Sequence, residues 1–575
     1  MIRLSKYLKP FAVMVACVLA LVFFQSLADL RLPNLMARIV DDGITKGNTP
    51  FIWQTGRFML LVALGGVLCS IAAGYLSARV SSGLGRSLRS AVFSHVESFS
   101  LDEFDKIGTA SLITRTTNDI MQVQMVSLVF MRMVVSAPMM AVVGVIMAVS
   151  EDARLSLILV AVLPVIAGAI VFLASKGLPL FQIMQKKIDR LNLVLRENLT
   201  GVRVVRAFNR DEHEAERFNE ASRDLTDTAI KVHRIMSSLM PVMMLTLNLT
   251  AVAIIWIGGH RIDAGSLEVG SMMAFIQYAM QILMSLLMLS MVFVMLPRAA
   301  ASAQRINEVL DSVPEIKDPE DAKKAGSERG HLQFRDVTFS YPGAEKPAVS
   351  HVSFEAWPGE VTAILGGTGS GKSTLVSLIP RFYDIDSGEI LVDGVDLRSL
   401  RQADLRAKIG FAPQKAVLFS GTIADNIRYG KTDATDEEMR RAAEIAQALD
   451  FVTQMKDGFE SVIAQSGTNV SGGQKQRLSI ARALIRKPEI YIFDDSFSAV
   501  DFKTDARLRA ALRSETKEAT VLIVAQRVST VMDADRIIVL DEGSVVGIGT
   551  HKELMETCEV YREIVLSQLS LEEIA

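Results

Sequence analysis

The sequence has few cysteines and little net charge. Its 575 residues include three cysteines, and the formal net charge is −3. So small a charge offers no basic surface for a nucleic acid, and we expect no nucleic-acid partner. Cys17, Cys69 and Cys558 lie far apart, the first two in apolar runs. Their spacing indicates neither a metal site nor a redox pair, so we interpret them as packing residues.

The N-terminus also lacks a recognisable cleavage site. Arg3, Lys6 and Lys9 precede the apolar run 11–28, an arrangement that resembles a signal peptide. The run is longer than the usual signal core, and no small-residue cleavage motif follows it. We therefore expect it to be the first membrane helix.

Long stretches of residues 1–297 lack charge, whereas residues 330–575 read as an ordinary soluble domain. A helix needs about 20 apolar residues to cross the hydrocarbon core. Uncharged stretches that qualify or come close are 11–28, 58–78, 133–149, 155–175, 235–259 and 269–297. Extended into their polar flanks, they predict spans at about 11–30, 58–80, 130–150, 155–175, 235–259 and 269–297. The sequence thus predicts a membrane all-α domain of six helices over 1–297, a linker over 298–329 and a soluble domain over 330–575.

An even number of crossings leaves the N-terminus and the soluble domain on the same side. Lys and Arg are frequent before the first span and in the connections 79–132 and 176–234. The positive-inside rule therefore predicts a multi-pass protein of the cell membrane, embedded in the lipid bilayer with both termini and the soluble domain in the cytoplasm. The two long connections have apolar residues at helical spacing, so we expect membrane helices that continue far into the cytoplasm.

Two features of the spans allow two interpretations each. The methionines of the last span share one helix face, which indicates either helix packing or a soft wall for varied apolar ligands; they are Met273, Met280, Met284, Met288, Met291 and Met295. Arg132 is either an interfacial anchor, the interpretation that we prefer, or a charge in a cavity. Pro138, Pro164 and Pro241 interrupt other spans and are candidates for bends.

The soluble half contains a phosphate-binding loop in its expected context. Residues 361–379 read VTAILGGTGSGKSTLVSLI, an apolar strand that leads through a glycine-rich loop into a helix. Backbone N–H groups of such a loop surround phosphates, Lys372 would reach the β- and γ-phosphates, and Ser373 would bind Mg²⁺. We expect ATP and Mg²⁺ as cofactors. The nucleotide-binding residues would be Gly366, Gly367, Thr368, Gly369, Ser370, Gly371, Lys372, Ser373 and Thr374.

Two further motifs extend this chemistry. The apolar strand 490–493 ends in Asp494 and Asp495, and a carboxylate there is placed to hold Mg²⁺. Residues Ser471, Gly472, Gly473 and Gln474 precede a helical pattern and form a second loop suited to phosphate. Two such loops far apart in the sequence either bind two anions or share one between copies of the chain.

With these motifs in order, the whole chain resembles an ATP-binding cassette (ABC) half-transporter of the exporter type, similar to bacterial multidrug exporters. Residues 366–373 match the Walker A motif, residues 470–474 the signature motif, with Val470 in place of the commoner leucine, and Asp494 the Walker B aspartate. Tyr341, within FSYPG, matches the aromatic residue that stacks on adenine. Gln414, within FAPQ, matches the glutamine that contacts Mg²⁺, and Asp501 ends the D-loop.

The resemblance implies an α/β P-loop NTPase fold for the soluble domain, the ABC nucleotide-binding domain. It also implies that two cassettes dimerise head to tail, each ATP lying between the Walker A motif of one chain and the signature motif of the other. Segments near Phe104 and Phe208 would then be coupling helices seated on the cassettes.

The sequence departs from the family pattern at two catalytic positions. Asp495 stands where the family has a glutamate that polarises the attacking water, and Gln526 stands where it has a histidine. Aspartate withdraws the carboxylate by about 1.5 Å, one C–C bond, and a misplacement of about 1 Å can cost about 100-fold in rate. Glutamine cannot carry the proton or the positive charge of histidine. We expect a site that binds ATP well and hydrolyses it slowly.

These substitutions lead to a prediction about assembly and function. In a heterodimer, a different half-transporter with the usual glutamate and histidine would use this chain's intact signature motif to complete a competent site. The pair would export hydrophobic or amphipathic small molecules, drug-like or lipid-like, from the cytoplasm. The alternatives are a homodimeric lipid or peptide exporter and a nucleotide-gated regulator. An importer subunit is disfavoured because importers usually carry the cassette and the membrane domain on separate chains.

Overall fold

The computed structural model describes residues 2–324, 326 and 329–569, without the side chains of residues 2, 170, 173, 174, 178, 239, 287 and 290–294. The chain divides into two compact units. The membrane unit comprises Met1–Glu97 and Ala110–Ser312, and the cassette unit comprises Ser98–Thr109 and Val313–Ala575.

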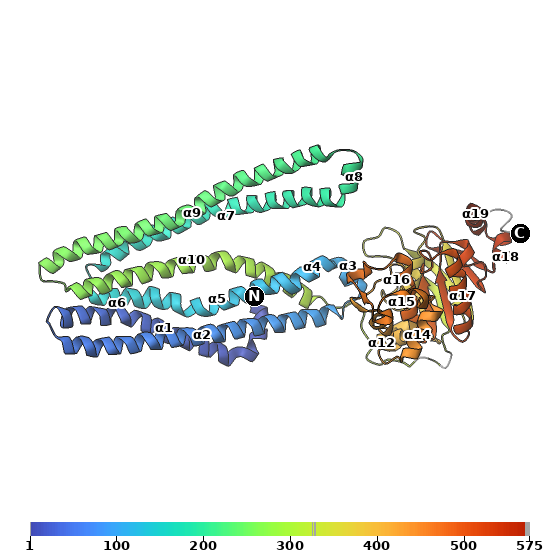
Figure 1. Cartoon of the computed structure of the whole chain (residues 1–575), viewed down its shortest axis with the longest axis horizontal. Coiled ribbons are helices and arrows are strands. Elements are labelled where there is room, and N and C mark those ends of the chain that lie inside the picture. Colours follow the sequence, from blue (N-terminus) through green and yellow to red (C-terminus); the bar gives the residue numbers. More distant parts are fainter. Residues whose placement is uncertain (1, 325, 327–328, 570–575) are drawn as a thin grey trace. The chain divides into compact units, whose positions relative to one another are not determined.

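The membrane unit is built from long helices (Figure 1). Its α-helices are α1 (Ala12–Arg38), α2 (Thr49–Val96), α4 (Thr109–Thr114), α5 (Ile120–Pro138), α6 (Gly144–Glu151), α7 (Ser156–Thr200), α8 (Val202–Ala207), α9 (Asp211–Asp263) and α10 (Val269–Asp311). A 3₁₀ segment, η1 (Ile2–Phe11), precedes α1. Short π-helical segments adjoin these helices at η2 (Ile39–Ile44), η3 (Arg115–Asp119) and η4 (Met139–Val143), the last directly after Pro138, where the proline removes a backbone donor.

Within the described residues, five helical stretches are long and apolar enough to cross a membrane: Arg3–Ile44, Thr49–Val96, Thr109–Glu151, Asp211–Asp263 and Val269–Leu286. Each contains or overlaps one of the six stretches that the sequence marks as spans. The remaining stretch, 155–175, falls on the start of α7, where Ser156–Ala169 is a shorter apolar helix and the ribbon continues as one helix to Thr200.

Several helices run well past the apolar stretches. α7 and α9 lie side by side and are joined by α8 at one end (Figure 1). The pair is held together by polar contacts, including a salt bridge of 2.6 Å between Arg217 and Glu197. α10 continues to Asp311, so residues 298–311, which the sequence analysis assigns to a linker, are helical. Their polarity reflects the end of the apolar stretch and not the end of the helix.

The cassette unit combines two main sheets. An antiparallel sheet has the order β2-β1-β4-β5, from β1 (Leu332–Phe339), β2 (Val349–Ala356), β4 (Ser387–Val392) and β5 (Val395–Asp396). The central sheet has the order β12-β11-β3-β10-β9-β6 and comprises β3 (Val361–Gly366), β6 (Ile409–Ala412), β9 (Ile490–Asp494), β10 (Thr520–Val524), β11 (Arg536–Asp541) and β12 (Ser544–Gly549). Only β12 pairs in antiparallel fashion in this sheet. A small ribbon pairs β7 (Gly421–Thr422) with β8 (Val462–Ile463).

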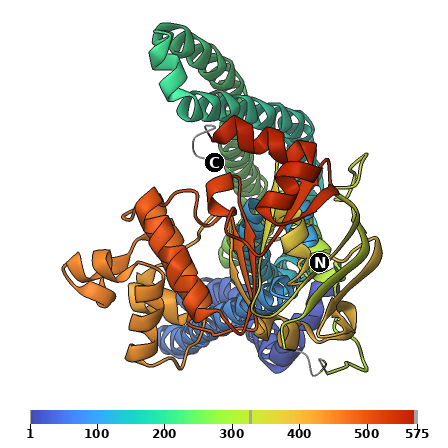
Figure 2. The same ribbon diagram turned by 90° about the vertical axis from the view of Figure 1, so that its right-hand side faces the viewer.

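Helices cover the central sheet, whose inner strands β9 and β10 are buried along their whole length, as expected of parallel strands with both faces covered. The helices of this unit are α3 (Leu101–Ile107), α11 (Lys372–Leu378), α12 (Gln402–Ala407), α13 (Ile423–Arg428), α14 (Asp436–Ile445), α15 (Leu449–Gln454), α16 (Gly472–Leu484), α17 (Phe502–Glu515), α18 (His551–Thr557) and α19 (Glu559–Gln568). Figure 2 shows the antiparallel strands, in olive, and helices α14–α16, in orange, on opposite sides of this unit.

The strand order explains where a site can form. β3, β10, β9 and β6 are neighbouring parallel strands, so their carboxyl ends meet at one edge of the sheet. Loops that leave such an edge are the usual place for ligands in open α/β sheets. The P-loop follows β3, and Gln526 follows β10. Asp494 is the last residue of β9, and Gln414 follows β6.

Candidate ATP site

The P-loop connects β3 to α11 through backbone conformations that favour glycine. Gly369 and Gly371 have φ angles of +85° and +92°, in the left-handed region that side chains rarely adopt. The Lys372 ammonium donates to the carbonyl oxygen of Gly366 at 2.9 Å and lies 3.3 Å from the Ser370 hydroxyl oxygen. The loop therefore has the tight curvature that a backbone phosphate cradle requires, with a cation at its centre.

Lys372 is almost completely buried, 7% exposed. Burial lowers the pKa of its ammonium group, and the charges of Asp495 and Asp494 act in the opposite direction. Because burial disfavours the charged form of Lys372, the negative charge of a bound polyphosphate would stabilise this ammonium group.

Asp494, the last residue of β9, lies directly beside the P-loop. The Ser373 hydroxyl donates to its carboxylate at 2.9 Å, and the residue is 5% exposed. Burial raises the pKa of Asp494, and the hydrogen bond from Ser373 partly opposes this. A hydroxyl and a carboxylate in contact form an all-oxygen donor pair of the kind Mg²⁺ prefers, so these residues fit the metal that the sequence predicts.

The next residue, Asp495, is in contact with Gln414 and with Gln526, the other substituted catalytic position. Its Oδ2 accepts from the side-chain amide of Gln414 at 3.4 Å and from that of Gln526 at 3.3 Å. Its φ of +45° lies in the left-handed region, where aspartate is tolerated better than most residues. Burial raises the pKa of Asp495, with the hydrogen bond from Gln414 acting against it. The carboxylate is thus held by two neutral amides at the edge of the site.

Tyr341 lies in the loop after β1 and is 37% exposed, as a surface for a base requires. Its hydroxyl and that of Thr374 are 3.1 Å apart. Its ring packs edge-on against Phe339 and Tyr383, with centroids 5.0 Å and 5.4 Å away. The Tyr383 hydroxyl in turn donates to the carboxylate of Asp105, in α3, at 3.3 Å. This link between Tyr341 and α3 could not be predicted from the sequence, because no local pattern relates residues so far apart.

α3 is one of two short helices found near the predicted coupling positions. It contains Phe104 and belongs to the cassette unit. α8 ends just before Phe208 and belongs to the membrane unit. α3 begins with a capping box between Ser100 and Glu103, which satisfies backbone donors at its first turn.

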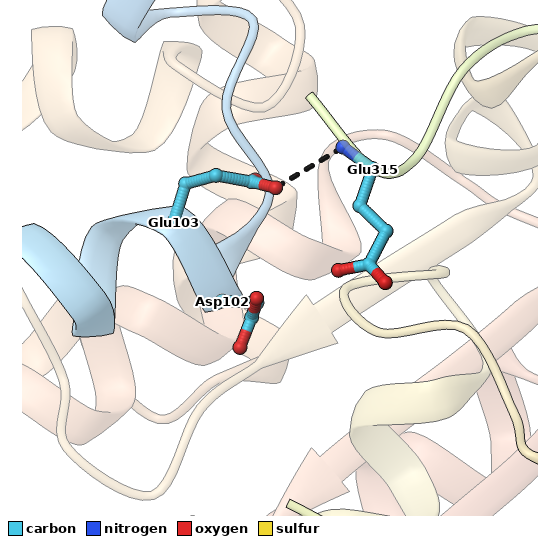
Figure 3. Close-up of side chains that lie close together, drawn as sticks. All are labelled: Asp102, Glu103 and Glu315. Atoms are coloured by element: carbon cyan, nitrogen blue, oxygen red, sulfur yellow. Dashed lines mark hydrogen bonds between the residues drawn. The ribbon is translucent and has the colours of Figure 1, made fainter. Parts of the chain in front are cut away.

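Three acidic residues meet where α3 contacts the segment after α10 (Figure 3). Glu103 accepts from the backbone N–H of Glu315 at 3.0 Å. Burial alone would raise the pKa of Glu103, but hydrogen bonds from Ser100 and from that N–H hold it below the ordinary value. Asp102 forms a salt bridge with Lys106. The hydrogen bond from Glu315 explains Glu103 as a residue that fastens α3 to the segment after α10, whereas the salt bridge of Asp102 lies within α3.

The signature motif is packed against the D-loop of the same chain. Ser471 caps α16, and its backbone N–H donates to the Gln474 side chain at 2.8 Å. A Cβ at Gly473 would lie 2.7 Å from the carbonyl oxygen of Ala499, so only glycine fits there. Asp501 caps α17 by accepting from the N–H of Thr504 at 3.0 Å. Ser471, Gly472 and Gln474 are not buried, and the face that they form with the D-loop is open to another molecule.

Comparison with known proteins decides the family. Residues 15–286 match the ABC transporter transmembrane region, and residues 349–498 match the ABC transporter family. An uncharacterized ABC transporter ATP-binding protein of Mycobacterium tuberculosis is 45% identical over 98% of this chain and 97% of its own length. The chain belongs to the ABC transporter family.

Other relatives refine this assignment. The YfiB protein of Bacillus subtilis, an uncharacterized ABC transporter ATP-binding protein, is 38% identical over 98% of both chains. An ATP-dependent lipid A-core flippase of Hahella chejuensis is 32% identical over 99% of this chain and 97% of its own. A bacterial Atm1-family ABC exporter solved with ATP bound superposes with a TM-score of 0.80 at 25% identity, over 97% of this chain and 98% of that one. The protein is therefore an ABC exporter half-transporter of the membrane, with an ATPase coupled to transport.

The loop that contains Gln526 is held by hydrogen bonds that could not be predicted from the sequence. Gln568, at the end of α19, donates to the backbone carbonyl of Gln526 at 2.8 Å and accepts from the N–H of Val528 at 2.8 Å. Both hydrogen bonds use the backbone of the loop, so they fix its path whatever side chain occupies position 526. The nearest sequence signal is a lone glutamine in a C-terminal helix, which has no recognisable pattern.

The membrane unit of the exporter contains a cavity of about 640 Å³ between α1, α5, η4 and α10. Met284, Met288 and Met295 of the predicted methionine face line it, which favours the soft-wall interpretation for these three. Met273 and Met280 are not among its lining residues, and the side chain of Met291 lies outside the described residues. Arg132 also lines the cavity, which favours the alternative that we did not prefer, a cavity charge.

Proposed function

We propose that this chain is one subunit of an asymmetric ABC exporter. Its own Walker A and Walker B motifs bind Mg-ATP and hydrolyse it slowly, while its signature motif completes a faster site on a different partner chain. The partner carries the usual catalytic glutamate and histidine.

The observation that carries this proposal is the environment of Asp495. The shortened carboxylate is engaged by the amides of Gln414 and Gln526 at 3.4 Å and 3.3 Å. A carboxylate that accepts from two amides has less capacity left to orient an attacking water. Position 526 contributes a neutral donor, where histidine could carry positive charge toward the γ-phosphate. The groups that hold nucleotide and metal, namely Lys372 and the pair of Ser373 and Asp494, are in place.

The complete signature loop supports the second half of the proposal. Ser471 and Gln474 are satisfied within their own capping box, and Gly473 fits closely against the D-loop. The signature loop is therefore already formed in this chain, and the nucleotide of a partner could bind to it without rearrangement.

Exposed apolar residues at the end of the α7–α9 pair support assembly with a second chain. Phe208 and Val204 are 74% and 60% exposed at α8. Large apolar side chains so exposed on a charged surface are typical of a contact site. We assign the cassette of the partner as the surface that contacts α8.

The proposal includes a transport direction and a substrate class. The protein lies in the cell membrane with both termini and the cassette in the cytoplasm, and it moves hydrophobic or amphipathic compounds outward. The alternative is a homodimeric lipid exporter, and the similarity to lipid A-core flippases favours a lipid substrate. The asymmetric exporter and the homodimeric exporter predict different rates of ATP hydrolysis for this chain without a partner.

The test is to purify the full chain without a partner and measure its ATP hydrolysis. We expect a kcat below about 1 s⁻¹, the low end of the usual enzyme range, with Mg-ATP still bound. The double variant Asp495→Glu/Gln526→His restores both catalytic groups and should raise kcat at least tenfold, on the order of a general base's contribution. Asp495→Asn is the matched control and should give no gain. Brisk hydrolysis by the unmodified chain, or a double variant no faster than it, would contradict the proposal.

A further inference from the structure

The cavity of the membrane unit has a volume in the range of small-molecule sites, about 300–1,000 Å³. Much of its wall is thioether, from Met133, Met140, Met284, Met288 and Met295. Such side chains adapt to apolar ligands of varied shape. The cavity lies between helices of the apolar spans, so an apolar chain inside it would exchange one hydrocarbon environment for another.

One carboxylate and one guanidinium interrupt this soft wall. Asp29 of α1, which is half-buried, and Arg132 of α5, which is exposed, both line the cavity. Amide and hydroxyl groups accompany them, from Gln25, Ser26, Ser136, Gln281 and Ser285. Charge at this depth is costly and, where present, faces a partner or a site.

The other buried acids of the membrane unit have partners in the protein. Asp152 pairs with Arg261, and Asp119 with Arg305. Asp41 accepts from the backbone N–H groups of Gly270 and Ser271. These contacts account for their charges as structural features.

Asp29 and Arg132 differ from these. Among the residues that the structure describes, neither forms an ion pair. The side chain of Asp29 is hydrogen-bonded to the neutral side chain of Gln25, and its backbone carbonyl accepts from Gln281. The backbone carbonyl of Arg132 accepts from the Ser136 hydroxyl. Two opposite charges therefore face one cavity without neutralising each other by contact.

We propose that this cavity binds a zwitterionic amphiphile, with Asp29 holding its cationic group, Arg132 its anionic group and the methionines its apolar chain. This inference rests on the proposed export function and narrows its substrate class. A bound amphiphile would displace water from both charged groups, which would strengthen both charge contacts. A ligand with a single charge leaves either Asp29 or Arg132 desolvated and unpaired, so the cavity selects against it.

The test compares four probes with the same dodecyl chain: dodecylphosphocholine as the zwitterion, dodecyltrimethylammonium as the cation, dodecyl phosphate as the anion and dodecyl glucoside as the neutral compound. Binding is measured below the critical micelle concentration to the full chain in nanodiscs, with empty nanodiscs subtracted and no nucleotide present. We expect the zwitterion to bind tightest, by about tenfold over each singly charged probe, as one lost charge contact predicts.

The variants assign each charge. Asp29→Asn should weaken the zwitterion and the cation about tenfold and leave the anion unchanged, whereas Arg132→Gln should weaken the zwitterion and the anion and leave the cation unchanged. Arg31→Gln is the matched control, because Arg31 lies two positions from Asp29 on α1 but does not line the cavity. Binding of the neutral probe reports whether each variant is folded.

Equal binding of the four probes to the unmodified chain would overturn the inference, even if a variant fails to fold. So would a probe order that neither substitution changes. Diheptanoyl phosphocholine in place of the single-chain zwitterion distinguishes a diacyl lipid from a single-chain ligand as the source of the headgroup. Because no nucleotide is present, the result is independent of the ATPase test, and either proposal can fail without the other.

Discussion

At the scale of single residues, we expect protonation of Asp494 to affect the binding of Mg²⁺. Burial raises the pKa of its carboxyl above the ordinary value of 3.8, and a proton there competes with Mg²⁺. Mg²⁺-dependent affinity for ATP should therefore fall on acidification at a higher pH than an exposed aspartate would give. Without Mg²⁺, acidification should have the opposite effect on the stability of the protein. A raised carboxyl pKa means that the native state binds more protons, so the unliganded cassette should lose stability as pH rises from 3.8 through that pKa.

Titrations of a fluorescent ATP analogue, with Mg²⁺ or with EDTA, at neutral and mildly acidic pH measure this effect. Asp494→Asn is the control and should remove the pH dependence along with most of the Mg²⁺ dependence. A Mg²⁺ affinity that declines only near the ordinary pKa of aspartate would contradict the prediction.

Gly473 gives a second prediction at this scale. A methyl group at this position would lie 2.7 Å from the Ala499 carbonyl oxygen, so Gly473→Ala must shift the D-loop or the signature loop. ATP binding at the chain's own Walker A motif should be unchanged, while hydrolysis by the assembled pair should fall by at least about 100-fold, as a misplacement of about 1 Å implies. Gly472→Ala is the matched control, because its nearest neighbour, the Ala499 Cβ, is 3.8 Å away. Equal loss of hydrolysis in both variants would show that packing against the D-loop is not the cause.

That the residues of the candidate ATP site lie together could be predicted from the sequence because its parts are local. The P-loop, Asp494, Gln414 and Gln526 each follow a recognisable strand, and neighbouring parallel strands place their carboxyl ends together. What could not be predicted depends on contacts across the chain. The charges of Asp29 and Arg132 share a cavity through the packing of helices, and no spacing in the sequence encodes that.

At the scale of elements, Tyr383 links α3 to Tyr341, the residue predicted to stack on adenine. The hydroxyl of Tyr383 donates to Asp105 at 3.3 Å, and its ring packs against Tyr341. Burial, the charge of Asp105 and the neighbouring Tyr341 all raise the pKa of Tyr383, so its hydroxyl stays protonated and remains a donor at every physiological pH.

Tyr383→Phe keeps the ring and removes this hydrogen bond. ATP affinity should stay within about twofold, because the aromatic contact with Tyr341 remains, while stimulation of the ATPase by transported compounds should fall several-fold, in line with a hydrogen bond to a charged group. Asp105→Ala, which removes the acceptor, should have the same effect, and the double variant should add nothing further, as expected of two residues that act through one contact. Full additivity of the two losses would exclude the link.

The length of the helices was harder to predict than their existence. α10 continues through residues 298–311, beyond the end of its apolar stretch. Hydropathy identifies where a helix can lie in lipid, and it contains no signal for where a helix in water stops. The contact between Arg305 and Asp119 shows that packing against a neighbouring helix continues past the apolar stretch.

At the scale of the whole molecule, α8 is the feature through which a partner should act. Phe208 is 74% exposed beside it. Phe208→Asp should leave ATP binding by this chain unchanged but reduce transport by the assembled pair at least about tenfold, because burying an unpaired charge in an apolar contact opposes docking.

Transport and nucleotide binding in proteoliposomes that contain both subunits measure the two quantities separately. Arg210→Asp places the same charge two positions away, where the native side chain is already polar, and serves as the control. Equal transport by the Phe208→Asp pair and the unmodified pair would show that α8 does not dock.

The division of the chain into units has a practical consequence for building chimaeras. Residues 98–109 belong with the cassette, although they lie between two membrane helices in the sequence. A cassette transplanted from a relative at the boundary near residue 313 would bring its own counterpart of Tyr383 to a foreign α3. Exchanging both segments together keeps the Tyr383–Asp105 and Glu103–Glu315 contacts matched. The exchangeable module of this exporter is thus discontinuous, and recombination at a single junction would separate its two parts.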